Sequence, residues 1–117
     1  MQLTPKILES IYVMLYNCQP FSKWDLPLPE EIEFIVTDDI DTMGTYLYDD
    51  GEKFAHVITI SRARCGFLET VIRTMAHEMI HISRHNTVTE AWMKHDATFR
   101  RRAHSIGKEL GFDPLEL

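Results

Sequence analysis

The stretch FLETVIRTMAHEMIHI, residues 67–82, decides how the rest of the chain is interpreted. Its large apolar residues recur at the spacing of an α-helix and form one stripe over roughly 100° of the helix circumference. His77 and His81 lie near the opposite side of the same helical wheel. We therefore predict an amphipathic helix that packs its stripe on a sheet and turns two imidazoles towards a cleft. The stripe consists of Leu68, Val71, Ile72, Met75, Met79 and Ile82.

The residues before this helix show the two-residue period of β-strands. In EIEFIVT, residues 31–37, apolar side chains alternate with glutamates along the first half of the segment. GTYLYDDGEKFAHVITIS, residues 44–61, contains two β-prone runs around Asp50 and Gly51, a pair that signals a hairpin. These segments predict a small, mostly antiparallel three-stranded sheet in the middle third of the chain.

Two further helices are expected, one near each end. In LTPKILESIYVMLYNC, residues 3–18, Thr4 can cap a helix and Pro5 can occupy its first turn. AWMKHDATFRRRAHSIGKEL, residues 91–110, has an apolar stripe at helical spacing. We therefore predict an α+β fold, and residues 1–117 form a single domain because this length leaves no room for a second core. The stripe of the last helix is Trp92, Phe99, Ala103, Ile106 and Leu110.

Composition sets the class of protein. The chain is 44% hydrophobic and 26% charged, which is typical of a soluble globular domain. No apolar run approaches the roughly 20 residues of a membrane span, and residues 1–5 lack the features of a targeting segment. We therefore expect a cytoplasmic protein without a membrane partner. Cys18 and Cys65 stand alone in different segments, so each is expected to be a free thiol.

The charge of the chain bears on nucleic-acid binding. A formal net charge of −6 argues against a broad surface for phosphates, which needs a local excess of Lys and Arg. Arg100, Arg101 and Arg102 are the exception. Three consecutive residues fan over most of a helix circumference, so we expect them to form a solvated surface. A DNA-associated role through these arginines is retained as the weaker alternative.

The segment HEMIH, residues 77–81, has the spacing of a zinc-binding helix. Histidines at positions i and i+4 are neighbours on one helix face, so both rings can bind a single Zn²⁺ at about 2.0–2.1 Å. Glu78 follows the first histidine and is turned aside from the ion, where it can reach a water molecule on the metal. The helix geometry thus predicts His77 and His81 as ligands and Glu78 as the base.

A catalytic zinc needs a third protein ligand and one open position. His85 continues the i+4 series, but it lies about 12 Å along the axis from His77, too far to share one ion. Glu90 can bend back from the following loop and stays a candidate. His95 is better placed, because it falls beside the inward stripe of the last helix. His104 is interpreted as a surface or outer residue and His56 as a strand residue.

These residues also carry a family resemblance. HEMIH, thirteen further residues and then HDATFRRRAHSIG resemble the core of SprT-like (Spartan-type) zinc metalloproteases. MGTYLY, HVITIS and the helix that follows resemble the strand-strand-helix order of that family. The resemblance covers roughly residues 5–112 and implies a zincin-like fold. It also implies His77, His81 and His95 as zinc ligands and Glu78 as the catalytic glutamate.

Two departures from the family pattern accompany this resemblance. Asp96 stands where the family usually has glycine, and it can act as a helix cap. The sequence reaches Leu117 without the cysteine-rich zinc ribbon that many members append. Because such appended parts often bring these proteases to DNA, we do not transfer the DNA-linked role of the best-known members.

The sequence therefore predicts a Zn²⁺-dependent metallopeptidase acting on a protein or peptide substrate. Zn²⁺ lowers the pKa of a bound water towards about 7, and Glu78 takes its proton and passes it to the leaving nitrogen. An edge strand at residues 53–60 is expected to hold an extended substrate by strand addition. The alternative is a metal-stabilised, non-catalytic binding or assembly module.

Overall fold

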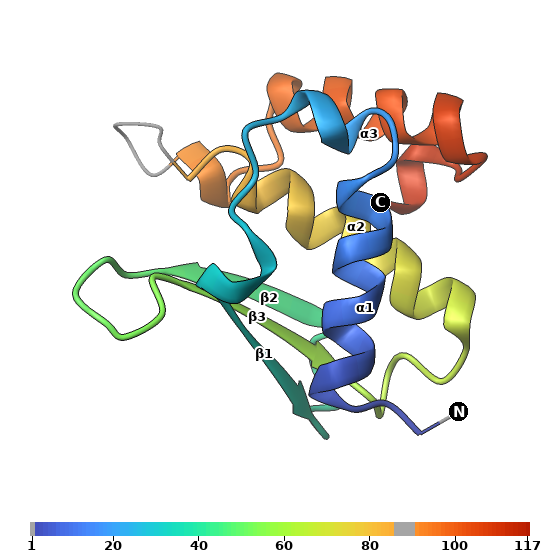
Figure 1. Ribbon diagram of the computed structural model, residues 1–117. Helices are drawn as coiled ribbons and strands as arrows, with labels where there is room; N and C mark the ends of the chain where they lie inside the picture. Colours follow the sequence, from blue (N-terminus) through green and yellow to red (C-terminus); the bar gives the residue numbers. More distant parts are fainter. Residues whose placement is uncertain (1, 86–90) are drawn as a thin grey trace.

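The fold combines three α-helices with one three-stranded sheet in residues 2–85 and 91–117, which the computed structural model describes (Figure 1). The α+β class predicted from the sequence is confirmed. In chain order the elements are α1 (Pro5–Tyr16), β1 (Ile32–Thr37), β2 (Gly44–Tyr48), β3 (His56–Ser61), α2 (Leu68–Ile82) and α3 (Ala97–Leu110). Four short 3₁₀ turns accompany them: η1 (Phe21–Lys23), η2 (Pro29–Glu31), η3 (Ala91–Met93) and η4 (Pro114–Glu116).

The sheet is mixed rather than mostly antiparallel. Its strand order is β1-β3-β2, with β3 antiparallel to β2, as the hairpin predicts, and parallel to β1. His56 at the start of β3 therefore lies opposite Ile32 on one side and Tyr48 on the other. The alternation in the sequence identifies the strands, but it does not state which strands are neighbours or in which direction they pair.

The central position of β3 overturns the expectation of an edge strand at residues 53–60. Both edges of β3 are occupied by hydrogen bonds to β1 and β2, so this strand has no free backbone groups for an added peptide. The edge strands are β1 and β2. Of these two, β2 packs extensively against α2.

The first helix begins as its sequence predicts. The hydroxyl of Thr4 accepts a hydrogen bond of 3.2 Å from the backbone N–H of Ile7, and Pro5 is the first helical residue. This geometry satisfies one of the free N–H groups of the first turn, and proline loses nothing there because it has no N–H to pair. The helix ends at Tyr16, before the proline-containing segment 20–29.

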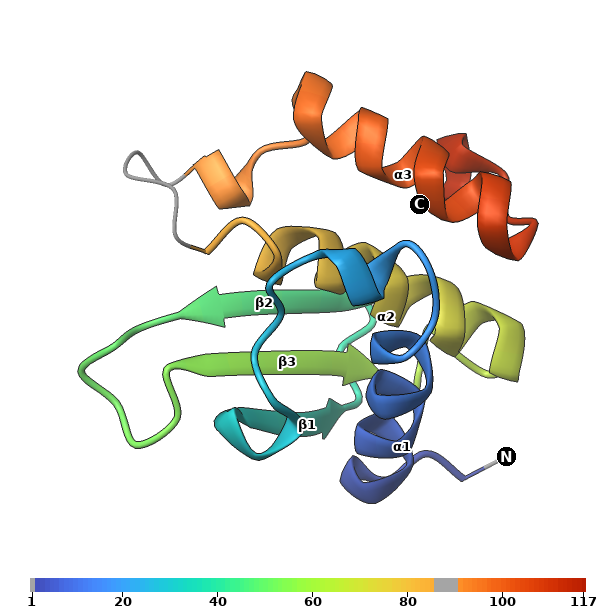
Figure 2. The same cartoon turned by 45° about the horizontal axis from the view of Figure 1, so that its top comes forward.

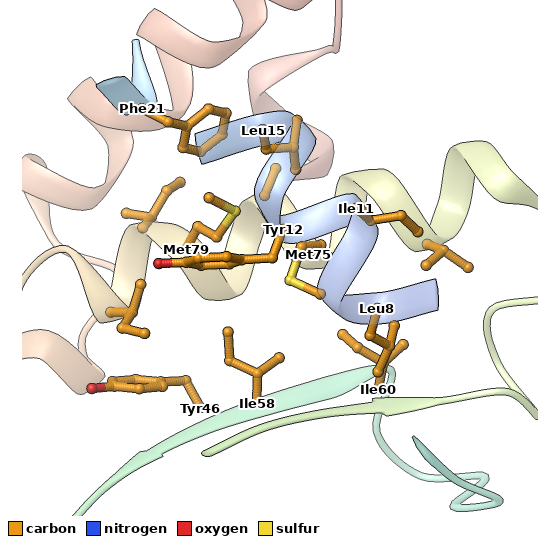
Figure 3. Packing of buried hydrophobic residues seen from close by; sticks show 14 of the residues in the cluster. Leu8, Ile11, Tyr12, Leu15, Phe21, Tyr46, Ile58, Ile60, Met75 and Met79 are labelled. Carbon is orange, nitrogen blue, oxygen red and sulfur yellow. The ribbon is translucent and has the colours of Figure 1, made fainter. Parts of the chain in front are cut away.

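The hydrophobic core lies between α1, α2 and one face of the sheet (Figure 3). Four of the six residues in the α2 stripe are completely buried, whereas Leu68 is 51% exposed and Ile72 is half-buried. Tyr12 of α1 is also buried, and its hydroxyl donates a hydrogen bond of 2.6 Å to the carbonyl of Pro27. That bond fastens the proline-containing segment to the core. The core residues labelled in Figure 3 are Leu8, Ile11, Tyr12, Leu15, Phe21, Tyr46, Ile58, Ile60, Met75 and Met79.

The third helix packs on the side of α2 that faces away from the sheet, so α2 lies in the middle of the molecule (Figure 2). This helix begins at Ala97, later than the sequence pattern suggests, because Asp96 caps it by accepting a hydrogen bond of 3.1 Å from the N–H of Phe99. Trp92 consequently lies in η3, and His95 lies in the turn between η3 and α3. The cap role predicted for Asp96 is confirmed.

Among the described residues, no helix combines the length and apolar character that crossing a membrane would require.

Gly107 offers a test of how closely α3 approaches the C-terminal segment. A Cβ at this position would lie 2.5 Å from the carbonyl oxygen of Phe112 and 2.9 Å from Cγ of Pro114. We expect Gly107→Ala to lower the free energy of unfolding by about 1–3 kcal/mol despite the better helix propensity of alanine, because backbone must shift to relieve the clash. Urea denaturation measures this difference.

Gly66→Ala is the matched control, because a Cβ there would meet no atom within 4 Å. This variant should stay within about 0.5 kcal/mol of the wild type. Equal stability of the two alanine variants would contradict the close approach at Gly107.

Candidate metal centre

Three imidazole rings from two parts of the chain meet beside α2. His77 and His81 project from adjacent turns of α2, and His95 reaches them from the turn before α3. The Nε2 atom of His81 lies 3.2 Å from Nε2 of His77 and 3.1 Å from Nε2 of His95. One potential ligand atom from each ring lies within 4.8 Å of the others. The structure thus brings together the three residues that the sequence analysis selects.

These distances fit a tetrahedral metal ion. Nitrogen ligands at about 2.0–2.1 Å from zinc, at tetrahedral angles, are separated by roughly 3.3 Å. The two shorter separations at His81 are close to that value. Three neutral imidazoles with one position left open suit Zn²⁺, although imidazole also binds other divalent transition metals.

The backbone fixes the tautomer of His81. Its Nδ1 lies 2.6 Å from the carbonyl oxygen of Trp92, and a carbonyl oxygen can only accept, so Nδ1 carries the proton. In the neutral ring, Nε2 therefore presents its lone pair to His77 and His95. A carbonyl on the far nitrogen of a ligating histidine orients the ring and strengthens its binding to a metal.

A bidentate ion pair holds the turn that carries His95. The guanidinium of Arg84, just after α2, donates hydrogen bonds of 2.8 and 2.9 Å to the two carboxylate oxygens of Asp96, and a weaker one of 3.3 Å to the carbonyl of Lys94. The residues on both sides of His95 are thus tied to the end of α2. The Arg84 side chain is only 6% exposed, whereas that of Asp96 is 38% exposed, so solvent reaches the carboxylate end of this pair. The same hydrogen bonds lower the pKa of Asp96 to about 2.

Phe99 forms the floor of the centre. Its ring centroid lies 5.0 Å from those of His77 and His81 and 4.4 Å from that of His95. The phenyl ring is 3% exposed and separates the imidazoles from water on that side. Phe99 thus limits the rotamers of all three rings, which pre-organises the site.

The environment favours the neutral rings of His77 and His81. Burial, with the neighbouring His81 and His95, lowers the pKa of His77 to about 4, although a hydrogen bond with the backbone of Leu117 acts in the opposite direction. Burial also lowers the pKa of His81. Their lone pairs are therefore available to a metal at neutral pH without competition from protons.

The carboxylate of Glu78 lies beside this group. Its Oε2 lies 4.0 Å from Nε2 of His77, and the residue is only 4% exposed. Burial in an apolar environment raises the pKa of Glu78 to about 8. A divalent cation at the three imidazoles would oppose this shift, because a nearby positive charge favours the carboxylate.

A cleft of about 260 Å³ lies beside Glu78 and His77. The start of β2 forms one wall, where a Cβ on Gly44 would lie 2.9 Å from the methyl group of Thr74 and 3.1 Å from a carbonyl oxygen of β3. Glycine therefore allows the edge strand to approach α2 closely. Residues 116–117 form another wall, held by an ion pair of 2.9 Å between Glu116 and Arg73. The residues around Trp24 do not line this cleft.

The remaining candidates lie elsewhere. His85, as expected, does not join the three rings, and Glu90 falls outside the described residues. His104 is exposed on α3, and His56 is a residue of β3, as predicted. Cys18 and Cys65 are free thiols, as expected.

The three consecutive arginines do not form one solvated surface. Arg102 is half-buried: it donates a hydrogen bond to the hydroxyl of Ser83, and its guanidinium lies 5.1 Å from the centroid of the Trp24 ring. Arg100 and Arg101 are exposed, as predicted, and Arg100 donates to the carbonyl of His95 at 3.1 Å. The prediction for Arg102 is wrong because the segment around Trp24 covers that side of α3.

Sequence reasoning missed the outer residues of the centre. The Trp92 carbonyl carries no sequence signal, because any residue supplies the same group. Arg84 carries a weak sequence signal, since it stands three residues after His81, in the turn that ends the helix. Its pairing with Asp96 depends on how α2 and α3 meet.

Comparisons with protein-family models, with curated proteins and with solved structures gave no match for this chain.

Metal binding can be measured directly. We expect the wild-type protein to bind one equivalent of Zn²⁺, and we expect His77→Ala, His81→Ala and His95→Ala each to weaken binding at least about 100-fold, because each change removes one nitrogen ligand. His104→Ala should bind as the wild type does, since His104 is exposed and outside the group. Elemental analysis gives the stoichiometry and chelator competition gives the affinity. Wild-type affinity in His95→Ala would reject the proposed ligand set.

His56 should make stability depend on pH. Burial and the neighbouring His85 lower its pKa from 6.5 to about 4, so between these values the unfolded chain binds more protons than the folded one. The contribution of a neutral His56 is therefore complete above pH 6.5 and is lost as the pH falls towards 4. We expect the protonation of His56 to lower the free energy of unfolding by roughly 1–3 kcal/mol over this pH range.

The difference between wild type and His56→Gln isolates this contribution, because His77 and His81 titrate in the same direction in both proteins. Urea denaturation at pH 7.5, 5.5 and 4, with a chelator present, measures it. Parallel pH profiles for the two proteins would show that His56 does not titrate as described.

Proposed function

We propose that this protein is a zinc-dependent metallopeptidase. The observation that carries the proposal is the convergence of His77, His81 and His95 with a buried carboxylate, Glu78, beside a cleft. A purely structural metal site needs ligands but no further carboxylate. Burying an ionisable group costs free energy, which favours a chemical role for Glu78 over a structural one.

The proposed chemistry assigns separate roles to metal and protein. Bound at the three imidazoles, Zn²⁺ supplies a Lewis acid that makes water more acidic at neutral pH. Glu78 accepts a proton from the attacking water as the peptide carbonyl is attacked, and then donates it to the leaving nitrogen. The Trp92 carbonyl keeps His81 in the tautomer that binds metal. The buried position of Glu78 strengthens its electrostatic interactions with the reacting groups.

Strand β2 is the element proposed to hold the substrate, in place of residues 53–60. It is an edge strand, it contacts α2, and its first residue lies in the wall of the cleft beside Glu78. An extended peptide can pair with the backbone groups of such an edge without a requirement for a particular sequence. We therefore propose that unfolded or extended protein segments are the substrates.

We further propose that the chain is related to the SprT-like metalloproteases. The support is the motif HEMIH followed by His95 and Phe99, and the position of Phe99 under the three imidazoles. Asp96 replaces the glycine usual in that family, and its cap and ion pair give it a role of its own here.

Two observations bear on the alternative of a non-catalytic module associated with DNA. Arg102 is engaged by Ser83 and Trp24, which leaves Arg100 and Arg101 as the exposed arginines of this group. The buried Glu78 also has no purpose in a site that only stabilises the fold. Both favour the enzyme.

Glu78→Gln tests the proposal. Glutamine has nearly the same shape but cannot accept a proton at this position, so cleavage of an unfolded protein should fall at least about 1,000-fold while zinc binding is retained. Cleavage of unfolded casein by the zinc-loaded protein is followed by gel electrophoresis and mass spectrometry.

Glu69→Gln is the control, because Glu69 is an exposed glutamate on the same helix and should leave cleavage unchanged. Cleavage retained in Glu78→Gln would reject the assigned base. A wild-type protein that binds zinc and cleaves nothing in a broad peptide screen would favour the binding module.

A further inference from the structure

A second cavity, of about 550 Å³, lies away from the three metal-binding imidazoles. Its walls come from residues 25–31, which include η2, from the end of the β2–β3 hairpin loop with the start of β3, and from His85 just after α2. None of His77, Glu78, His81 and His95 lines it. The proposed peptidase chemistry therefore makes no use of this cavity.

The walls of this cavity carry an excess of negative charge. Asp25, Glu30 and Glu31 contribute three carboxylates, and Lys53 is the only Lys or Arg among the lining residues. Within the described part of the chain, none of these three carboxylates forms an ion pair. The Lys53 ammonium lies 5.7 Å from the centroid of the Phe54 ring instead. The cavity thus holds three like charges that repel one another and a single lysine that pairs with none of them in the described residues.

Two histidines at the back of the cavity add ring nitrogens, and that of His85 is an acceptor. Nδ1 of His85 lies 2.7 Å from the carbonyl of Ile82, so it donates, and the neutral ring has its lone pair on Nε2. His56 is only 7% exposed, and its Nδ1 is paired at 2.8 Å with the hydroxyl of Tyr46. Neither Nε2 atom has a hydrogen-bond partner among residues 2–85 and 91–117.

The unpaired nitrogen of His56 faces the cavity. No buried side-chain nitrogen or oxygen in the described residues lacks a partner, so this Nε2 must be accessible, and the cavity is the space that His56 lines. Its ring packs edge-on against His85, with centroids 4.7 Å apart, and 5.2 Å from the ring of Tyr48. The buried His56 side chain thus combines a hydrogen bond at Nδ1 with an accessible Nε2, and it lines a cavity with acidic walls.

We propose that this cavity is a binding site for an organic cation, an ammonium or guanidinium group. Such a group has several hydrogen-bond donors and no acceptor, which complements carboxylates and the lone pair of His85. The π faces of Phe54 and the imidazoles favour a cation as well. The lowered pKa of His56 agrees with this, because a neutral imidazole does not repel a positive ligand.

The same features argue against other ligands. Three carboxylates exclude an anion. The His56 and His85 nitrogens do not form, with any carboxylate, a group of three ligand atoms close enough to hold a metal ion, since His77, His81 and His95 are the group that meets this condition in the described residues. An organic cation, in contrast, is large enough to contact both the imidazoles and the acidic rim.

The test uses N-acetyl-arginine amide as the probe and N-acetyl-citrulline amide as its neutral isostere. With the full chain, NMR of the imidazole C–H groups should show shifts at His56 and His85 on addition of the arginine probe and at least a 10-fold weaker response to citrulline. Equal responses to the two compounds would overturn the proposal, as would no response to the arginine probe at 20 mM.

The double variant Asp25→Asn, Glu30→Gln removes two carboxylates that form no hydrogen bond within the described residues. The fold should therefore be retained, and the unfolding temperature of the variant verifies this. Affinity for the arginine probe should fall at least about 5-fold. Glu109→Gln with Glu9→Gln, which removes two exposed carboxylates from α3 and α1, is the control for net charge and should leave the affinity unchanged. Unchanged affinity of the Asp25→Asn, Glu30→Gln variant for the arginine probe would show that these carboxylates do not recognise the cation, and would overturn the proposal.

The NMR shifts of His56 and His85 also show whether the cation belongs to a polypeptide or to a free amine. A basic peptide that binds at least 10-fold more tightly than agmatine assigns the site to an arginine or lysine side chain of a polypeptide, and similar affinities assign it to a free amine. Mg²⁺ or Zn²⁺ that shifts His56 and His85 more strongly than either compound would overturn the proposal in favour of a metal site. None of these readouts depends on cleavage, so failure here is separate from failure of the proposed peptidase activity.

Discussion

The ion pair between Arg84 and Asp96 is the interaction on which the arrangement of the metal centre depends. It joins the end of α2 to the cap of α3, and His95 is the residue immediately before that cap. Two parallel hydrogen bonds between planar groups fix direction as well as distance. The side chain of Arg84 is nearly buried, so the loss of Asp96 would remove a charge-assisted contact from a poorly solvated guanidinium next to the site. The carbonyl of Trp92 fixes the orientation of His81 in a similar way, because it accepts a hydrogen bond from Nδ1 of that ring.

The central position of α2 links the hydrophobic core to the proposed chemistry. One side of this helix buries Met75 and Met79 against α1 and the sheet, and the other presents His77 and His81 to α3. A side chain cannot move on one face without disturbing packing on the other, because protein interiors are close-packed. The core thus holds the imidazoles in place, and the cleft beside Glu78 forms where the edge strand β2 meets the same helix.

The described residues contain two histidine groups with different geometry. His77, His81 and His95 turn their nitrogens towards one another, an arrangement suited to a shared cation. His56 and His85 pack edge-on, and both line a cavity that has acidic walls. A contact series connects the two groups, since Trp92 packs edge-on against Tyr46, whose hydroxyl is bonded to His56.

The sequence by itself determined the local elements and the two candidate ligands of α2. Helical periodicity and the HExxH spacing act within a few residues, so Thr4 as a cap, the buried stripe and the neighbouring positions of His77 and His81 follow from local geometry. Only the tertiary structure decided what depends on distant segments. The parallel pairing of β1 with β3, the role of β2 as the edge beside α2 and the support of His95 by Arg84 arise from how separate elements pack. Periodicity reports which face of an element is buried, but it does not report which element lies against that face.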